Sequence, residues 1–117
     1  MGITVKKIEK WTKRKKTAKL LKAMSSEEKD IRLALAKALG TIENEDSVNG
    51  LVGLLRDVDP EIRVAAIESL RNVGNNRSTE FVRYLVNNDN DENVRKVASE
   101  ALNILKNKEA KEELSTK

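Results

Sequence analysis

One pattern of apolar and small residues occurs three times along the chain. Ile31, Ile62 and Val94 each begin a stripe that continues three, four, seven, eight and eleven positions further on. This spacing places the side chains on one face of an α-helix. The copies lie 31 and 32 residues apart, and six columns align across all three. The pattern predicts helices near residues 27–42 and 60–74, and a last one from about residue 91.

A second apolar segment lies before each copy, at residues 20–24, 48–55 and 81–86. The two later segments predict helices near residues 45–57 and 78–87. Each unit is then an antiparallel pair of helices, about 31 residues long, that cannot bury both apolar faces alone and must stack on its neighbours. The expected fold class is all-α: a right-handed α-solenoid of about three helical hairpins with roughly seven helices. Leu39, Leu70 and Leu102 share one column, and we expect them to be equally buried.

Turn residues mark where these helices begin and end. Asp59 is a suitable N-cap, and Pro60 suits the first helical position. Ser25 and Glu28 have the spacing of a capping box. Gly74 follows the middle helix, where we expect the left-handed conformation of a C-terminal glycine.

The two ends differ from the middle of the array. At the N-terminal end, the pattern favours a short helix over residues 4–12 and a loop at 13–16, rather than one long helix over residues 4–24. In the last copy Lys96 and Ser99 occupy columns that are apolar before, as in a terminal cap. After Lys106 we expect a solvated helix that frays at residues 115–117. The expected organisation is a single domain, 1–117, with a basic cap at 1–24, repeats at 25–107 and a polar tail at 108–117.

Residues 59–74 resemble the D-P-x-V-R-x-A-A-x-x-L-x-x-L-G motif of the HEAT-like repeat family, in the short prokaryotic form also found in phycobilin lyases. The resemblance covers about residues 16–107, although the first copy departs at Leu35 and the third lacks the Asp-Pro and the glycine. It implies a scaffold or interaction module. It also implies that the repeated arginines bond to acids or carbonyl groups of the adjacent turn; these structural arginines are Arg32, Arg63 and Arg95.

Charge is distributed unevenly along the chain. The net charge is +4, yet residues 1–24 carry nine Lys or Arg against a single acid, Glu9. Such a cluster attracts phosphate or acidic protein surfaces. A solvated cap, an acidic protein partner, nucleic acid and attraction within the molecule all stay open as explanations. Trp11, among these lysines, either plugs the end of the core or stacks on a base. The candidate partner-binding residues are Lys13, Arg14, Lys15, Lys16, Lys19, Lys22, Arg56 and Arg83.

Catalytic chemistry finds little support. The chain has no histidine and no cysteine, which excludes thiol nucleophiles and serine–histidine systems. Phosphate-binding glycine loops are absent, and the aspartates at 57, 59, 89 and 91 lack the order of a calcium loop. We expect no enzyme activity, cofactor, metal or small-molecule substrate. No apolar run approaches the roughly 18 residues of a membrane span and no signal peptide is visible, so we expect a soluble cytoplasmic protein.

The sequence therefore favours a non-enzymatic protein-interaction scaffold. We expect the partner to bind on an inner helical face formed by the second helices, where Lys19, Lys22, Gly53, Arg56, Glu80 and Arg83 would be exposed. The alternative is binding of nucleic acid or another polyanion through the basic N-terminal segment.

Overall fold

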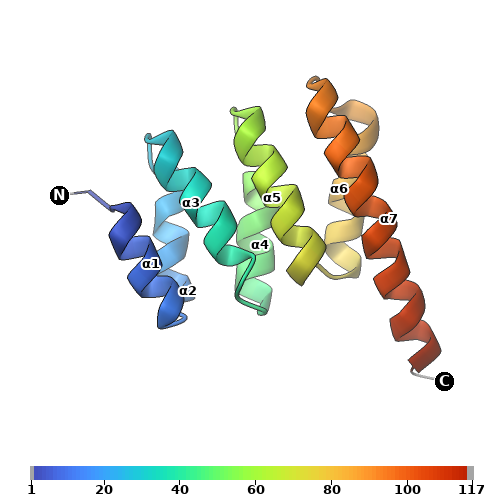
Figure 1. The fold of residues 1–117 in the computed structure, drawn as a ribbon, viewed down its shortest axis with the longest axis horizontal. Helices are drawn as coiled ribbons and strands as arrows, with labels where there is room; N and C mark the ends of the chain where they lie inside the picture. Colours follow the sequence, from blue (N-terminus) through green and yellow to red (C-terminus); the bar gives the residue numbers. More distant parts are fainter. Residues whose placement is uncertain (1, 116–117) are drawn as a thin grey trace.

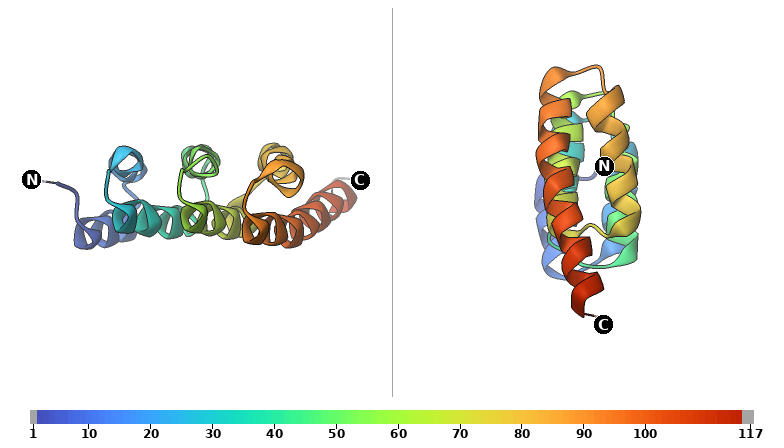
Figure 2. Two further views of the ribbon diagram at one scale, coloured as in Figure 1. Left: turned by 90° about the horizontal axis from the view of Figure 1, so that it is seen from above. Right: turned by 90° about the vertical axis from the view of Figure 1, so that its right-hand side faces the viewer.

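Helices alternate between two layers in the computed structural model, which describes residues 2–115 (Figure 1). The first layer holds α1 (Val5–Lys13), α3 (Lys29–Leu39), α5 (Pro60–Val73) and α7 (Glu92–Ser115). The second layer holds α2 (Thr17–Leu21), extended by a short 3₁₀ turn (Lys22–Ser25), then α4 (Glu45–Leu54) and α6 (Asn76–Asn88). Figure 2 shows the second-layer helices side by side over the first layer. Within the described residues the fold is an all-α helical repeat, as predicted.

The N-terminal segment forms two helices, so the single long helix considered as the alternative is wrong. α1 ends at Lys13, and the chain reverses through residues 13–16 before α2 begins. Lys15 adopts the left-handed conformation with φ of 52°, and the Lys16 N–H donates to the carbonyl oxygen of Trp11 at 2.8 Å. The four residues 13–16 are all exposed, and they are called the basic turn below.

Side-chain caps fix most of the helix starts. Thr4, Asn44 and Asp59 each accept a backbone N–H of the first turn, and Pro60 follows Asp59 as predicted. The capping box predicted at Ser25 and Glu28 is wrong. There Glu28 is the N-cap without a side-chain bond, and Ser26 Oγ accepts the Glu28 N–H.

The left-handed conformation predicted for Gly74 is wrong. Its φ is −68° and its ψ is 161°, so the residue is extended rather than left-handed. Glycine is required here by space, because a Cβ would overlap the carbonyl oxygen of Leu70 and lie 2.6 Å from Ser78 Oγ. The chain thus passes closely over the end of α5 before α6 begins.

The aligned columns of the first layer form the core. Ile31, Ile62 and Val94 are buried at equivalent positions. Leu39 and Leu70 are fully buried, but Leu102 is only partly buried, so the prediction of equal burial is wrong at the third copy. Leu39 faces the second-layer helix that follows it, since its Cδ1 lies 3.0 Å from where a Cβ on Gly50 of α4 would be. No second-layer helix follows α7 in the described residues, so no such helix packs over Leu102.

The second layer keeps a register of its own. Leu20, Leu51 and Val82 form one fully buried column, spaced by 31 residues. At one register of this layer, the side-chain size changes at every step. The register holds Lys19 of α2 and Lys22 of the 3₁₀ turn, then Gly50 and Gly53 of α4, then Phe81 and Tyr84 of α6. In α4 these residues face α2, and in α6 they line the side towards α4.

The C-terminal end of the array is polar. Lys96 and Ser99 are exposed, as expected of a cap. α7 continues to Ser115 and passes beyond the other helices, which confirms the predicted extension after Lys106 (Figure 1). Lys108 of this extension donates from Nζ to the carbonyl oxygen of Asn72 at 2.8 Å, near the C-terminal end of α5. Residues 116–117, included in the predicted frayed end, lie outside the described part.

Candidate protein-interaction surface

The repeated arginines join successive turns into a ladder. Arg32 donates from Nε to Asp57 Oδ2 at 2.8 Å and from NH1 to the carbonyl oxygen of Ser26 at 2.8 Å. Arg63 repeats this geometry, with Nε 3.0 Å from Asp89 Oδ2 and NH1 2.8 Å from the carbonyl oxygen of Asp57. Each guanidinium therefore holds its own turn through a carbonyl group and the next turn through a carboxylate. The side chains of these pairs are 5–13% exposed, which shields them from solvent screening.

Charges around the first turn reinforce the ladder. Hydrogen bonds to Asp57 raise the pKa of the Arg32 guanidinium above its ordinary value. Lys29 Nζ lies 3.1 Å from Asp59 Oδ2 and 2.6 Å from Glu61 Oε2. The hydrogen bonds of Lys29, first to Glu61 and then to Asp59, raise the pKa of its ammonium group. The pKa of Asp59 is lowered, first by the Glu61 backbone N–H and then by Lys29. These contacts fix the turns that begin α3 and α5.

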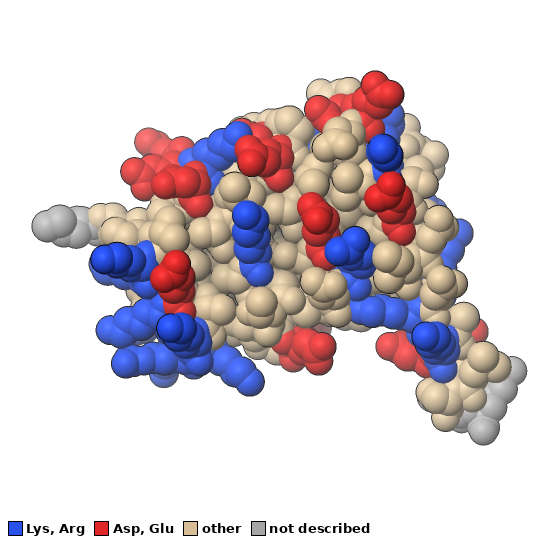
Figure 3. Space-filling model, viewed as in Figure 1, with Lys and Arg blue, Asp and Glu red and all other residues tan. Residues whose placement is uncertain are grey.

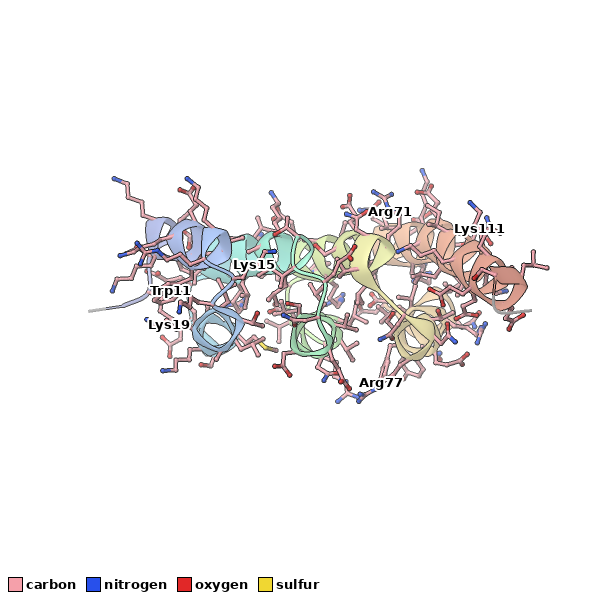
Figure 4. The ribbon with its side chains drawn as sticks, turned by 90° about the horizontal axis from the view of Figure 1, so that it is seen from below. Trp11, Lys15, Lys19, Arg71, Arg77 and Lys111 are labelled. Carbon is pink, nitrogen blue, oxygen red and sulfur yellow. The ribbon has the colours of Figure 1, made fainter. Side chains whose placement is uncertain are left out.

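The predicted partner-binding residues fall into separate regions. The basic turn lies at the end of the helices opposite the α4–α5 turn, and lysines and arginines gather at that corner (Figures 1 and 3). Lys19 and Lys22 are exposed along the second layer. Arg56 and Arg83 lie further along the same layer, on the end of α4 and on α6. Trp11 is partly buried against the core, between α1 and the second layer (Figure 4).

An open groove separates α4 from α6. Its volume is about 580 Å³, and apolar atoms make up most of its surface. It is lined by Val52, Leu55, Arg56, Glu80, Phe81, Tyr84 and Leu85. Tyr84 is 65% exposed, and Phe81 is partly buried. Of the candidate partner-binding residues, Arg56 lines this aromatic groove. Glu80, which the sequence also predicted to be exposed on the inner face, lines it as well and forms an ion pair with Arg83.

Phe81 and Tyr84 were not identified as candidate residues from the sequence, because both were counted with the apolar face of their helix. A signal was nevertheless present. At an offset of 31 residues, Phe81 aligns with Gly50 and Tyr84 with Gly53. Glycines at this register let Leu21 and Met24 lie close over α4, whereas the aromatic residues face an open groove. A change from the smallest to the largest side chains within one repeat column is a usable indicator of an exposed site.

Metal binding and membrane spanning find no support in the described residues. Residues 2–115 contain no group of three acidic side chains placed to hold a metal ion. Within the same range, every helix is too short or too polar to cross a bilayer.

Comparison with known proteins agrees with the two-layer repeat architecture. The family model described as HEAT repeats matches residues 17–114, from the start of α2 almost to the end of α7. Comparison with curated proteins finds no match. HEAT repeats generally mediate protein–protein interactions and are typically non-catalytic scaffolds. The matched range covers both layers and the arginine ladder, and on this basis the chain belongs to the HEAT repeat family.

Proposed function

We propose that the protein is a non-enzymatic binding module whose second layer, α2, α4 and α6, receives a partner protein in the aromatic groove. The observation that carries the proposal is Tyr84, a large side chain that is 65% exposed beside an apolar groove. Exposed aromatic residues next to apolar pockets are enriched among the residues that dominate binding energy. A solenoid offers such surfaces repeatedly along one layer.

The charges around the groove favour an acidic partner. Arg56 lines the groove and has no ion-pair partner among the described residues. Lys19 and Lys22 continue positive charge along the same layer. Positive charge of this kind accelerates encounter with acidic surfaces, and buried aromatic contacts then supply affinity. An amphipathic segment with apolar side chains and flanking carboxylates fits both features.

The experiment compares two exposed apolar residues. Wild type, Tyr84→Ala and Val58→Ala are immobilised, proteins captured from source lysate are identified, and the purified partner is titrated by calorimetry. Val58 is the control because it is 89% exposed on the α4–α5 turn, outside the groove lining. Tyr84→Ala should weaken binding by about 2 kcal/mol, and Val58→Ala should not change it. Equal affinities for all three proteins would reject the groove as the binding site.

The basic turn supports a second candidate function, polyanion binding. Its four side chains are exposed, and the described residues supply no ion-pair partner to them. A mobility-shift titration of duplex DNA at two salt concentrations compares wild type with the Lys13/Arg14/Lys15/Lys16→Ala variant. Binding through phosphates would weaken steeply with salt, by roughly one unit of logarithmic slope per contact. Tight binding at about 0.15 M salt that the variant loses would replace the protein-partner proposal with this one.

A further inference from the structure

The arginine ladder is incomplete at its last step. Arg95 donates from NH1 to the carbonyl oxygen of Asp89 at 2.7 Å, as Arg32 and Arg63 do to their own turns. Those two arginines also hold an aspartate of the next turn through Nε and NH2. Arg95 has no carboxylate partner among residues 2–115. The Nε–Nη2 edge of the guanidinium, which holds a carboxylate in the two earlier steps, therefore holds none within residues 2–115.

The two filled steps define the chemistry that this site selects. Asp57 and Asp89 each accept a hydrogen bond at Oδ1 from the backbone N–H two residues later, at 3.0 Å in both cases. The carboxylate is thus locked within an Asp-x-Asp turn while it accepts two bonds from the arginine. A glutamate has one more methylene group and cannot keep the same turn. The matching ligand is an aspartate presented in such a turn.

A second observation concerns the helix that precedes that turn. In the first filled repeat, Leu39 lies against the following second-layer helix, α4. Both α4 and α6 are followed by the turn that an arginine binds. At the last repeat the equivalent leucine, Leu102, is only partly buried. Within residues 2–115, neither a second-layer helix nor an aspartyl turn lies against α7 at the positions that α4, α6 and their turns occupy in the earlier repeats.

We propose that this end of the array binds an aspartyl turn at the C-terminal end of a helix in a partner protein, with Arg95 holding the carboxylate. A second copy of the chain is a poor occupant, because both of its Asp-x-Asp turns are already held by Arg32 and Arg63. Lys96 and Ser99 of the same helix are exposed, so this part of α7 also presents polar groups, which suits a reversible contact. The site is separate from the aromatic groove and does not depend on it.

Nuclear magnetic resonance of the full chain tests the proposal without a known partner. The probe is a blocked synthetic peptide with the sequence of residues 87–92, which contains the Asp89 turn, and the control peptide carries Asp89→Asn. Titration should shift the Arg95 Nε–H signal in a saturable manner. The signals of Arg32 and Arg63 should stay unchanged because their carboxylate sites are filled. The control peptide should bind about tenfold more weakly, since it loses a charge-assisted pair.

Two matched variants separate site binding from general charge attraction. Arg95→Lys keeps the charge but loses the planar fork, so the backbone signals of Val94 and Lys96 should no longer respond to the peptide. Arg77→Lys, on an exposed arginine at the start of α6, should leave the response intact. Equal shifts at Arg14, Arg77 and Arg95, or equal effects of the two peptides, would overturn the proposal. So would the absence of any Arg95 shift at about 5 mM peptide, where the binding energy would be below about 3 kcal/mol.

Discussion

Leu70 is fully buried in the middle of the array, with repeats on both sides. Leu70→Ala should lower the free energy of unfolding by roughly 2–5 kcal/mol, because the truncation removes apolar contacts and leaves a cavity. Against a typical domain stability of about 5–15 kcal/mol, this loss is a large fraction of the total. Urea denaturation followed by circular dichroism measures it. Lys96→Ala, on the exposed cap, should change little, and equal losses for the two variants would contradict the assigned faces.

Ser47 and Ser78 occupy the same position in α4 and α6 but differ in their bonds. Ser78 Oγ accepts the Asn75 N–H at 2.9 Å and completes a capping box. Ser47 Oγ is buried, and no hydrogen-bond partner is present for it among the described residues. Ser47→Ala should therefore raise stability by about 1 kcal/mol, and Ser78→Ala should lower it by a similar amount. Thermal unfolding of the two variants checks this, and a loss of stability in Ser47→Ala would show the argument to be wrong.

Asp59 links stability to pH through its lowered pKa. A carboxylate whose pKa falls on folding stabilises the protein above its unfolded pKa and loses that effect as the pH falls through the folded value. Asp59→Asn retains a good N-cap but removes the charge. Its urea midpoint should lie below that of wild type at pH 7. The two midpoints should converge as the pH drops below about 4, and a constant difference down to pH 2 would contradict the assignment.

For individual residues, the sequence correctly predicted burial in the columns that pack against a neighbouring repeat on both sides. It failed where burial depends on a missing neighbour or on close backbone approach. Leu102 has the right residue type but lacks a covering helix. Gly74 was correctly placed at a helix end, but its conformation is set by the passage of the chain over Leu70. Neither circumstance is encoded in the local apolar pattern.

Two glycines, one at the end of a helix and one within a helix, differ in how close the neighbouring helix lies. A Cβ on Gly40, at the end of α3, would overlap Ser69 Oγ and lie 3.1 Å from the Ser69 Cα on α5. A Cβ on Gly53, within α4, would meet only the flexible Met24 methyl group, at 2.6 Å. Gly40→Ala should destabilise the protein by about 1–3 kcal/mol by forcing α3 from α5. Gly53→Ala should stabilise it by up to about 1 kcal/mol through helix propensity. Denaturant midpoints measure both effects, and changes of the same sign would refute the assigned contacts.

The elements themselves were largely predictable, because periodicity and turn chemistry agree. The break after α1 and the start of α5 at Pro60 lie where expected. The aromatic groove was not predicted, since a helical pattern treats Phe81 and Tyr84 as core residues. Which apolar side stays uncovered is decided by the neighbouring helix α4, whose own glycines face the other way, towards Leu21 and Met24. The hand of the solenoid stays a prediction.

In the described residues, the extensive contacts between helices run between neighbours, in a slab of 49 × 34 × 14 Å. Local stability should therefore be highest in the middle and fall towards the ends. Amide hydrogen exchange should be slowest in α5, which packs against α3, α4 and α7. It should be fastest in residues 110–115, which are exposed beyond the last bundle contact. Uniform protection along the chain would instead indicate a single cooperative unit.

Charge is also segregated at this scale. The turns that precede α3, α5 and α7, together with the first turns of these helices, carry nine of the 19 acidic residues along one edge, while the basic turn lies at the opposite corner (Figure 3). Acidic groups at helix N-termini interact favourably with the helix dipoles. The sequence revealed this asymmetry as an excess of lysine in residues 1–24, but only the fold shows that the basic turn lies opposite the three acidic turns.

The exchange of glycine for aromatic residues at one register of the second layer has a consequence for how such arrays acquire partners. The junction of α2 with α4 is sealed over Gly50 and Gly53, and the junction of α4 with α6 opens beside Phe81 and Tyr84. Repeat length and topology are the same at both junctions, but the residues at this register differ, with glycines where the helices pack closely and aromatic residues where a groove lies open. A duplicated repeat can thus gain or lose a docking position while its neighbours go on folding as before. The fold is then retained, while substitutions at single positions change the surface that a partner would meet.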